Sequence, residues 1–177
     1  MTDTIHYSCL DSPFGPVFAA KTIKGVCLVS LSKISEAKFQ SLLRKSFRKD
    51  AIRDDRKLKN AIHELSDYFN GNRVNFRFPL DLSIGTEFQR KVWEKVSEIP
   101  YGELRSYKWI ASEIGNPDAV RAVGNAVGEN PVPPIIPCHR VIRSDGRLGG
   151  FSSGIALKKW LLRLEGHNTR STYSSQT

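Results

Sequence analysis

The stretch Asn130-Pro131-Val132-Pro133-Pro134-Ile135-Ile136-Pro137-Cys138-His139-Arg140-Val141-Ile142 carries the most information in this chain of 177 residues. Four prolines in its first eight residues exclude a helix and a central strand, because proline has no N–H to donate and clashes with the preceding turn. We therefore expect a stiff, extended arm that delivers Cys138 to a fixed place. Because a histidine directly follows the cysteine, the same stretch also points to a reactive site.

Two helices joined by a short turn are expected before this arm. Ser106 can cap the first helix, which ends at Gly115. Asn116 and Pro117 can supply the N-cap and the first helical position of the second helix, over residues 118–127. So short a turn between two helices is typical of a helix-turn-helix.

The second of these helices is built mainly from small residues, among them Ala119 and Gly124. One long basic side chain, Arg121, is expected to project from it. So thin a helix could approach a nucleic-acid groove closely. Packing of the small residues against neighbouring helices is the alternative, since helical hairpins are common in proteins that bind no DNA.

Helices are also expected on either side of this region. Thr86 and Gln89 have the spacing of a capping box, which predicts a helix start. The last helix is expected to end at Glu165-Gly166. The residues that it would turn toward the core are Leu157, Trp160, Leu161 and Leu164.

The first part of the chain predicts short strands and two helices. Strands are expected over residues 7–10, 17–21 and 26–31, with a further edge strand over 74–78. Ser35 can cap the first helix. The second helix would follow, with Leu58, Ile62, Leu65 and Phe69 on one face.

These elements predict the fold class α+β. We expect a small N-terminal α+β domain over residues 1–80 and a mainly helical domain with a helix-turn-helix over residues 86–170. A polar tail would follow over residues 171–177.

The net charge of +9 and the pI of about 9.6 permit a polyanionic partner such as DNA. The charge is spread along the chain, with 14 Lys and Arg against 9 Asp and Glu over residues 1–85 and 13 against 9 over residues 86–177, so it supports DNA binding only weakly. No apolar run approaches the roughly 18 to 20 residues that cross a bilayer, and no signal peptide is visible. We expect an intracellular protein without a membrane partner.

Three cysteines are a poor basis for a disulfide framework, which favours free thiols in a reducing compartment. A pairing of Cys9 with Cys27 across neighbouring strands stays open. No group of cysteines and histidines has the spacing of metal ligands, and no glycine-rich loop has the order that cradles phosphates. We therefore expect neither a metal nor a cofactor.

Cys138 is the candidate nucleophile. A thiol reacts as its thiolate, and an ordinary thiol with a pKa near 8.5 is mostly protonated at neutral pH. His139 could accept the proton, directly or through a water, and Glu165 could hold the histidine in the manner of a catalytic triad. A carboxylate at the end of a helix is unfavourable without a partner. An inert core cysteine and a solvated Glu165 are the alternatives.

Seven motifs in order resemble the 6-O-alkylguanine-DNA alkyltransferases, also called methylated-DNA–protein-cysteine methyltransferases. The resemblance covers residues 86–167 in unbroken register, and the N-terminal part matches that family's ribonuclease-H-like domain more loosely, through Leu10-Asp11-Ser12-Pro13. The motifs are Ile99-Pro100-Tyr101-Gly102-Glu103, Ser106-Tyr107, Gly115-Asn116-Pro117, Arg121-Ala122-Val123-Gly124, Asn130-Pro131, Ile136-Pro137-Cys138-His139-Arg140-Val141 and Leu164-Glu165-Gly166-His167.

The resemblance implies DNA repair by direct and irreversible transfer of an alkyl group to Cys138, from 6-O-alkylguanine and less readily from 4-O-alkylthymine in duplex DNA. The protein would act once, as a monomer, and would need no cofactor. His139 would act as the base, Glu165 would orient it, and Asn130 would tie the helix-turn-helix to the arm.

The resemblance also implies that the target base is flipped out of the duplex. Arg121 would enter the stack from a helix in the minor groove that also carries Ala119 and Gly124, and Tyr107 would promote rotation of the nucleotide. The pocket for the flipped base would be formed by Pro133, Val141, Phe151, Ser152 and Lys158.

The chain departs from its apparent relatives at a few positions. Phe151 replaces a common tyrosine, Ser153 replaces a glycine found in some relatives, and Gly128-Glu129 replaces a more basic pair. The candidate zinc ligands of some relatives have no counterparts among Cys9, Cys27, His6 and His63. Two further functions stay open: a lesion-binding protein without transfer activity, and a Cys-His hydrolase with multiple turnover.

Overall fold

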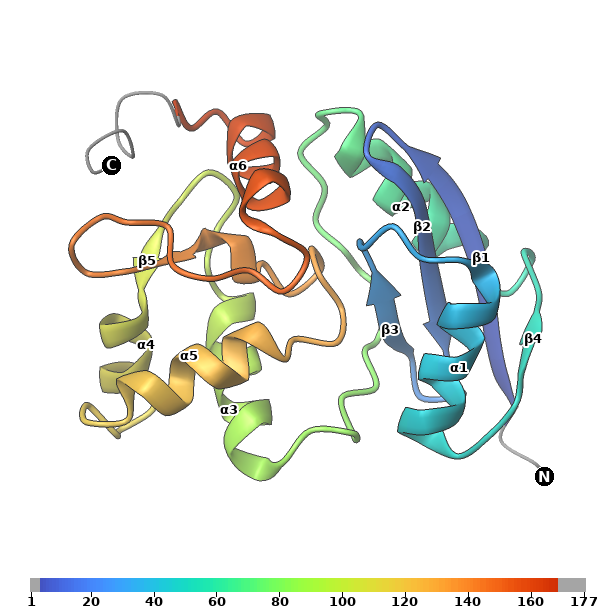
Figure 1. Cartoon of the computed structure of the whole chain (residues 1–177), viewed down its shortest axis with the longest axis horizontal. Coiled ribbons are helices and arrows are strands. Elements are labelled where there is room, and N and C mark those ends of the chain that lie inside the picture. Colours follow the sequence, from blue (N-terminus) through green and yellow to red (C-terminus); the bar gives the residue numbers. More distant parts are fainter. Residues whose placement is uncertain (1–3, 169–177) are drawn as a thin grey trace. The chain divides into compact units, whose positions relative to one another are not determined.

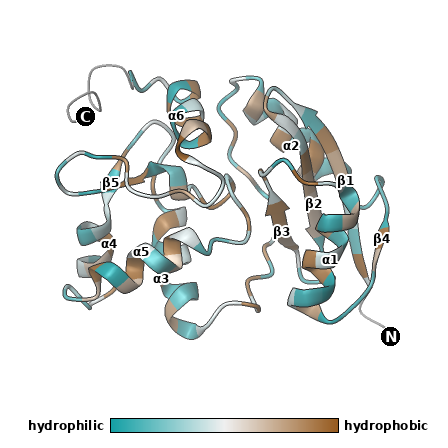
Figure 2. Cartoon of the chain, in the orientation of Figure 1, coloured by the Kyte–Doolittle hydropathy of each residue, from teal (hydrophilic) through white to brown (hydrophobic). Residues whose placement is uncertain are grey.

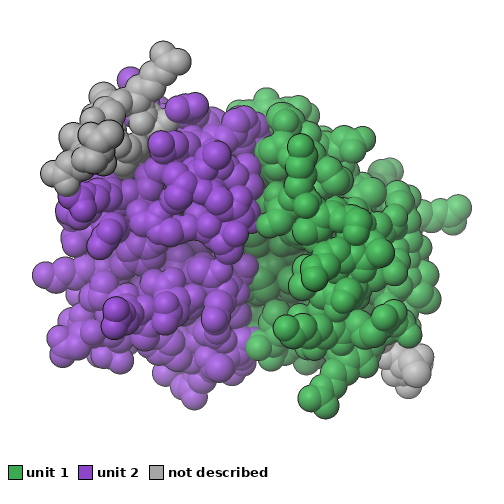
Figure 3. Space-filling model, viewed as in Figure 1, with its two compact units in different colours: residues 1–84, 131–133 green, residues 85–130, 134–177 purple. Residues whose placement is uncertain are grey.

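The computed structural model describes residues 4–168, which fall into two compact units (Figures 1 and 3). Unit 1 comprises the described residues up to Ile84 together with Pro131–Pro133. Unit 2 comprises Gly85–Asn130 and the described residues from Pro134 onward. The domain boundaries predicted from the sequence stay a prediction, and the tail predicted over 171–177 lies outside the described residues.

Unit 1 is built on a four-stranded sheet in the order β3-β2-β1-β4. The strands β1 (Ile5–Ser12), β2 (Gly15–Lys21) and β3 (Val26–Ser30) form an antiparallel meander, and β4 (Ala51–Arg53) pairs with β1 in parallel. The first three match the predicted strands, although β1 extends further at both ends.

Two helices complete unit 1. Helix α1 (Glu36–Phe47) begins after Ser35, whose side chain accepts a hydrogen bond from the backbone N–H of Lys38, as predicted. Helix α2 (Lys59–Phe69) buries Leu65 and Phe69. A largely apolar cluster joins α1 to the sheet, and hydrophobic colour marks its strands in Figure 2. Its buried members are Ile5, Tyr7, Phe18, Ala20, Cys27, Phe39 and Leu43.

The strand predicted over residues 74–78 is wrong, because that segment pairs with no strand. Its alternating pattern has another cause: the ring of Phe76 packs against Tyr68 at 5.9 Å and against Phe78 at 5.8 Å between centroids. Side-chain packing therefore produced a strand-like pattern without a ladder. The edge strand is instead β4, which is too short to show a period of two.

Unit 2 holds the helices α3 (Glu87–Ser97), α4 (Tyr107–Glu113), α5 (Val120–Gly128) and α6 (Ile155–Leu164). The predicted caps at Thr86 and Ser106 are confirmed, and Thr86 forms a complete capping box with Gln89. The indole N–H of Trp93 on α3 donates to the carbonyl of Ala126 on α5 over 2.7 Å. This buried bond anchors the second helix of the helix-turn-helix.

The start of α5 differs from the prediction. Asn116 and Pro117 lie in the turn, where the N–H of Ala119 donates to the Asn116 carbonyl over 3.0 Å. Ala119 is the N-cap, and α5 begins at Val120 without a side-chain cap. The Asn-Pro pair therefore closes a turn instead of opening a helix.

The proline-rich arm also differs from an extended segment. Residues 131–136 form bends and turns that are mostly buried, and the N–H of Val29 donates to the Pro131 carbonyl over 2.8 Å. This bond helps to place Pro131–Pro133 in unit 1. After the arm, Cys138–Arg140 form a 3₁₀ helix, η1, and β6 (Val141–Ile142) pairs in parallel with β5 (Arg105–Ser106).

Candidate functional site

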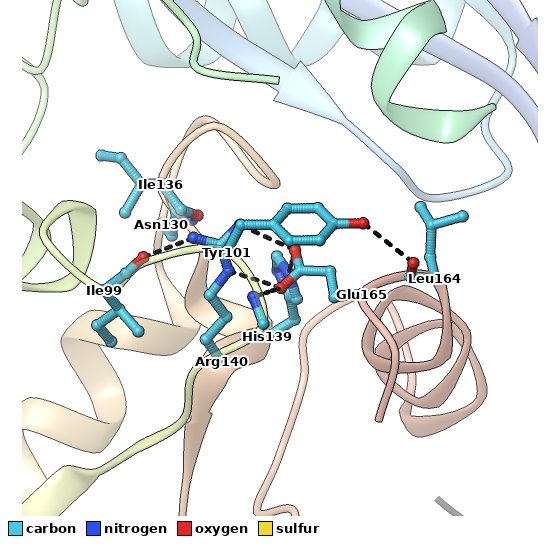
Figure 4. Close-up of polar contacts among 9 residues, drawn as sticks. Ile99, Tyr101, Asn130, Ile136, His139, Arg140, Leu164 and Glu165 are labelled. Atoms are coloured by element: carbon cyan, nitrogen blue, oxygen red, sulfur yellow. Dashed lines mark hydrogen bonds and ion pairs between the residues drawn. The ribbon is translucent and has the colours of Figure 1, made fainter. Parts of the chain in front are cut away.

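Cys138 is the first residue of η1, and only 4% of it is exposed. Its N–H donates to the Ile136 carbonyl over 2.8 Å. The Asn130 side-chain amide donates to the same carbonyl over 2.7 Å, and both of these residues are drawn in Figure 4. Because Asn130 follows α5, this pair of bonds joins the end of the helix-turn-helix to the backbone just before the thiol. The three cysteines are thiols outside any disulfide, and Cys9 and Cys27 lie on β1 and β3 with β2 between them.

His139 and Glu165 meet in the interior of unit 2. The histidine Nε2 lies 2.8 Å from Glu165 Oε1, and neither side chain is exposed. A carboxylate only accepts hydrogen bonds, so Nε2 carries the proton and Nδ1 of the neutral ring holds its lone pair. His139 therefore has the tautomer in which Nδ1 can accept a proton.

The Glu165 carboxylate is held by three groups besides His139 (Figure 4). Arg140 donates from Nε to Oε2 over 2.8 Å and from Nη2 to Oε1 over 2.9 Å, and the Gly102 N–H donates to Oε2 over 3.1 Å. Burial opposes ionisation, but the bonds from His139 and Arg140 outweigh it and hold the pKa of Glu165 far below its usual range. These hydrogen bonds thus offset the unfavourable interaction between a carboxylate and the C-terminal end of α6.

The resting site holds a thiol and not a preformed thiolate. Burial raises the pKa of the Cys138 thiol, although the Asn130 side chain, the Lys158 charge and nearby backbone N–H groups act in the opposite direction. Burial also lowers the pKa of His139, against the effect of Glu165. Both groups are therefore neutral at pH 7, and the thiol becomes a nucleophile only when a base takes its proton.

Lys158 is a fully buried cation on α6. Its Nζ donates to the carbonyls of Val141 over 2.6 Å, Leu148 over 2.5 Å and Gly150 over 3.5 Å. Burial lowers the pKa of Lys158 to about 8, and the neighbouring Cys138 opposes this shift. The lysine thus ties α6 and β6 to the loop after β6.

Tyr107, the first residue of α4, packs against the same loop. A Cβ added to Gly149 would lie 2.9 Å from the Tyr107 hydroxyl, and Gly149 has a φ of +70°, so only glycine fits there without strain. A Cβ on Gly124 of α5 would lie 3.9 Å from the Tyr107 ring. The tyrosine ring therefore lies between α5 and the loop.

The other predicted site residues have different environments. Arg121 is exposed on α5, Ala119 is half-buried at its N-cap, and Ser152 is exposed in the loop before α6. Phe151 is half-buried in that loop. Pro133 groups with unit 1, so its predicted place in the base pocket stays a prediction.

One buried residue and one helix face differ from what the sequence predicted. Arg140 received no role, although an arginine inside an apolar run must find a partner if it is buried. The stripe predicted on α6 was rotated: Lys158, Leu161 and Leu162 are buried, whereas Leu157, Trp160 and Leu164 are half-buried. The spacing of Lys158, Leu161 and Glu165 placed both polar residues on the inward face and could have indicated this.

Within residues 4–168, no cluster of histidine, cysteine and acidic side chains could hold a metal ion. None of the helices described is both long and apolar enough to cross a membrane.

Two family models match the chain. The DNA-binding domain of 6-O-methylguanine DNA methyltransferase matches residues 87–167, and the ribonuclease-like domain of the same family matches residues 5–82. Together they cover most of both units.

Known proteins of the same kind are similar over nearly their full length. A methylated-DNA–protein-cysteine methyltransferase of Methanosarcina barkeri is 42% identical over 94% of this chain and 100% of its own. The inducible methyltransferase of that name from Bacillus subtilis is 40% identical over 92% of this chain and 90% of its own. The crystal structure of Mycobacterium tuberculosis OGT in complex with DNA has a TM-score of 0.78 and 40% identity, and it covers 90% of this chain and 92% of its own.

Proposed function

Because the chain belongs to the family of the methylated-DNA–protein-cysteine methyltransferases, we propose that it repairs alkylated DNA by moving the alkyl group onto Cys138. The observation that carries the assignment of Cys138 is the buried relay in which Glu165 holds His139 with its basic nitrogen free of the proton. The substrate is 6-O-alkylguanine in duplex DNA, with 4-O-alkylthymine as a poorer one.

The reaction is a displacement at the alkyl carbon. His139 takes the thiol proton through a water, and the sulfur attacks the carbon attached to the guanine oxygen. A sulfur–carbon bond forms, the carbon–oxygen bond breaks, and guanine leaves with the electron pair and regains a proton. The product is a thioether, which no base in the site can reverse, so each molecule acts once.

The target base must leave the stack to reach a buried sulfur. Flipping costs a few kcal/mol, and a side chain that fills the vacated space offsets part of this cost. Arg121 is suited to that task because it is long, cationic and exposed on a helix of small residues. Ala119 and Gly124 give α5 the thin profile that lets it approach a minor groove.

The loop after β6 is suited to receive the flipped base. Lys158 holds the carbonyl of Val141, which has a second lone pair to accept from the guanine amine. The N–H of Ser152 donates to the guanine oxygen as negative charge develops there. Phe151 supplies an apolar wall, and Tyr107 helps to rotate the nucleotide.

The protein acts as a monomer inside the cell, on the damaged duplex itself. The DNA complex of the similar Mycobacterium tuberculosis protein supports a DNA partner. The net charge of +9 predicts binding that weakens as salt is added.

A mass measurement tests the proposal. The protein is mixed with a duplex oligonucleotide that carries one 6-O-methylguanine, and its intact mass and peptide map are recorded. We expect a gain of one methylene on Cys138. An unmodified Cys138 despite tight binding would identify a lesion-binding protein, and removal of the methyl group without a modified cysteine would identify a hydrolase.

A further inference from the structure

Each oxygen of the Glu165 carboxylate accepts two hydrogen bonds. Oε1 accepts from His139 and from Arg140, and Oε2 accepts from Arg140 and from the N–H of Gly102. A carboxylate offers about four lone-pair positions. All of them are occupied, so the group has no free position for a proton and no freedom to turn.

Arg140 supplies half of these bonds through a planar fork. Its remaining Nη1 donates to the Ile99 carbonyl over 2.5 Å, and its guanidinium lies 5.7 Å from the centroid of the Tyr101 ring. The Tyr101 hydroxyl in turn donates to the Leu164 carbonyl over 3.0 Å. Arg140 is therefore fixed on several sides, and it is only 8% exposed.

This arrangement is better explained by orientation than by stability. A buried ion pair gains little over a well-packed apolar pair, because both charges lose their hydration. The guanidinium fork, in contrast, defines the plane of the carboxylate that it binds. That plane determines where Oε1 lies and so how the His139 ring is turned.

We propose that Arg140 is a positioning residue for alkyl transfer: its fork fixes the Glu165 carboxylate, and through it the ring of His139. This inference rests on the proposed function of the site. Arg140 touches neither the thiol nor the guanine in this scheme, and it orients the His139 ring through Glu165.

Arg140 also has an electrostatic effect on the same histidine. The charged groups that act on the His139 ring are Glu165, Arg140 and Lys158, and the backbone of His139 contacts the Cys138 thiol. Glu165 favours the imidazolium, whereas the positive charges of Arg140 and Lys158 oppose it. Removal of the Arg140 charge would therefore raise the pKa of His139 and delay the appearance of the neutral base as pH rises.

Two substitutions separate orientation from charge. Arg140→Lys keeps the charge but cannot form the fork, and Arg140→Met removes both. Arg44→Met is the matched control, because Arg44 forms a similar Arg–carboxylate pair with Asp50 on the surface of unit 1. Single-turnover transfer from a 6-O-methylguanine duplex is measured at increasing protein concentration and at several pH values, with circular dichroism to measure the folded fraction.

We expect Arg140→Lys to lower the saturating transfer rate of folded protein at least about tenfold, because general-base catalysis contributes roughly 10²- to 10⁴-fold and depends on alignment. The protein concentration at half-saturation and the position of the acidic limb should not change. Arg140→Met should lower the rate and also move the acidic limb to higher pH. The Arg44→Met control should match the wild type.

Folded Arg140→Lys protein with the wild-type rate and pH profile would overturn the inference. Failure of both Arg140 variants to fold would overturn it as well, since Arg140 would then be a structural residue. Failure of the proposed function gives a different result, because the wild-type protein would then leave Cys138 unmodified.

Discussion

The two units bury different chemistry. The cluster between α1 and the sheet in unit 1 is apolar apart from the hydroxyl of Tyr7 and the thiol of Cys27. Besides the Cys138 thiol, the interior of unit 2 contains four ionisable side chains that are each at most 8% exposed. They are His139, Arg140, Lys158 and Glu165.

This difference separates residues that hold the fold from residues that serve the reaction. Apolar burial stabilises a unit at roughly 25 cal/mol per Å², whereas buried charges gain little net stability even when paired. Perturbed pKa values in a cluster are typical of functional sites. Substitutions of buried residues in unit 1 should therefore lower stability and leave alkyl transfer intact, whereas those of the buried ionisable residues in unit 2 should lower alkyl transfer.

The largest difference between the units is expected for two buried cysteines, Cys138 in unit 2 and Cys27 in unit 1. Cys138→Ala should abolish alkyl transfer completely, because the acceptor atom is gone, while duplex binding persists. Cys27→Ala should leave transfer unchanged and lower the free energy of unfolding by about 1 kcal/mol through loss of a small buried group. Transfer assays, duplex titrations and urea unfolding measure these effects, and loss of DNA binding by Cys138→Ala would make that residue mainly structural.

Two buried carboxylates give the next largest contrast. Glu165→Gln should slow transfer by roughly 10²- to 10⁴-fold and destabilise the protein by about 3–5 kcal/mol, because Arg140 loses its partner. Asp81→Asn in unit 1, where Asp81 accepts from Thr22 and Ser83, should cost about 1–3 kcal/mol and leave transfer intact. Equal transfer rates for the two folded variants would show that Glu165 has no greater role in transfer than Asp81.

The charge of Glu165 also predicts a pH dependence of stability. Its pKa in the folded protein lies well below the ordinary value of 4.5, so its contribution is fully present above that value and is lost as pH falls through the acidic range. Glu165→Gln protein should therefore lose less unfolding free energy between about pH 5 and pH 3 than the wild type does. If the unfolding free energies of the two proteins fell in parallel with pH, Glu165 would not be the source of the acid sensitivity.

Much of this contrast could be predicted from the sequence. The helices and their caps at Ser35, Thr86 and Ser106 follow from local patterns. The use of Cys138 as nucleophile and His139 as base stays a prediction. The role of Arg140 could not be predicted, because its partners Glu165 and Ile99 lie 25 and 41 residues away. Such a role depends on contacts between residues far apart in the sequence, and the spacing of nearby residues does not indicate these contacts.

A smaller effect on stability is expected for Arg121, an exposed cation of unit 2. Arg121→Ala should change stability by less than about 0.5 kcal/mol, because the side chain is exposed. Transfer from duplex DNA should fall far more than transfer from the free modified base, which needs no flipping. An equal loss of transfer rate on both substrates would show that Arg121 has no role in base flipping.

Two glycines with positive φ provide a further test. Gly149→Ala should displace Tyr107 and slow transfer severalfold in a folded protein, since the new Cβ would lie 2.9 Å from that ring. Gly25→Ala in unit 1 should leave transfer unchanged and destabilise the protein by at least about 2 kcal/mol, because its φ is +152° and its Cβ would lie 2.2 Å from the Pro79 carbonyl oxygen. Thermal unfolding and single-turnover assays separate the two outcomes.

In the proposed scheme, the buried charges of unit 2 serve one irreversible use of Cys138, so each molecule can remove one methyl group. Titration of the protein with an excess of 6-O-methylguanine duplex until transfer stops gives the number of methyl groups removed for each protein molecule. We expect a plateau at one methyl group, held on Cys138 as a thioether. Continued removal beyond one group for each molecule, or a plateau with Cys138 unmodified, would contradict it.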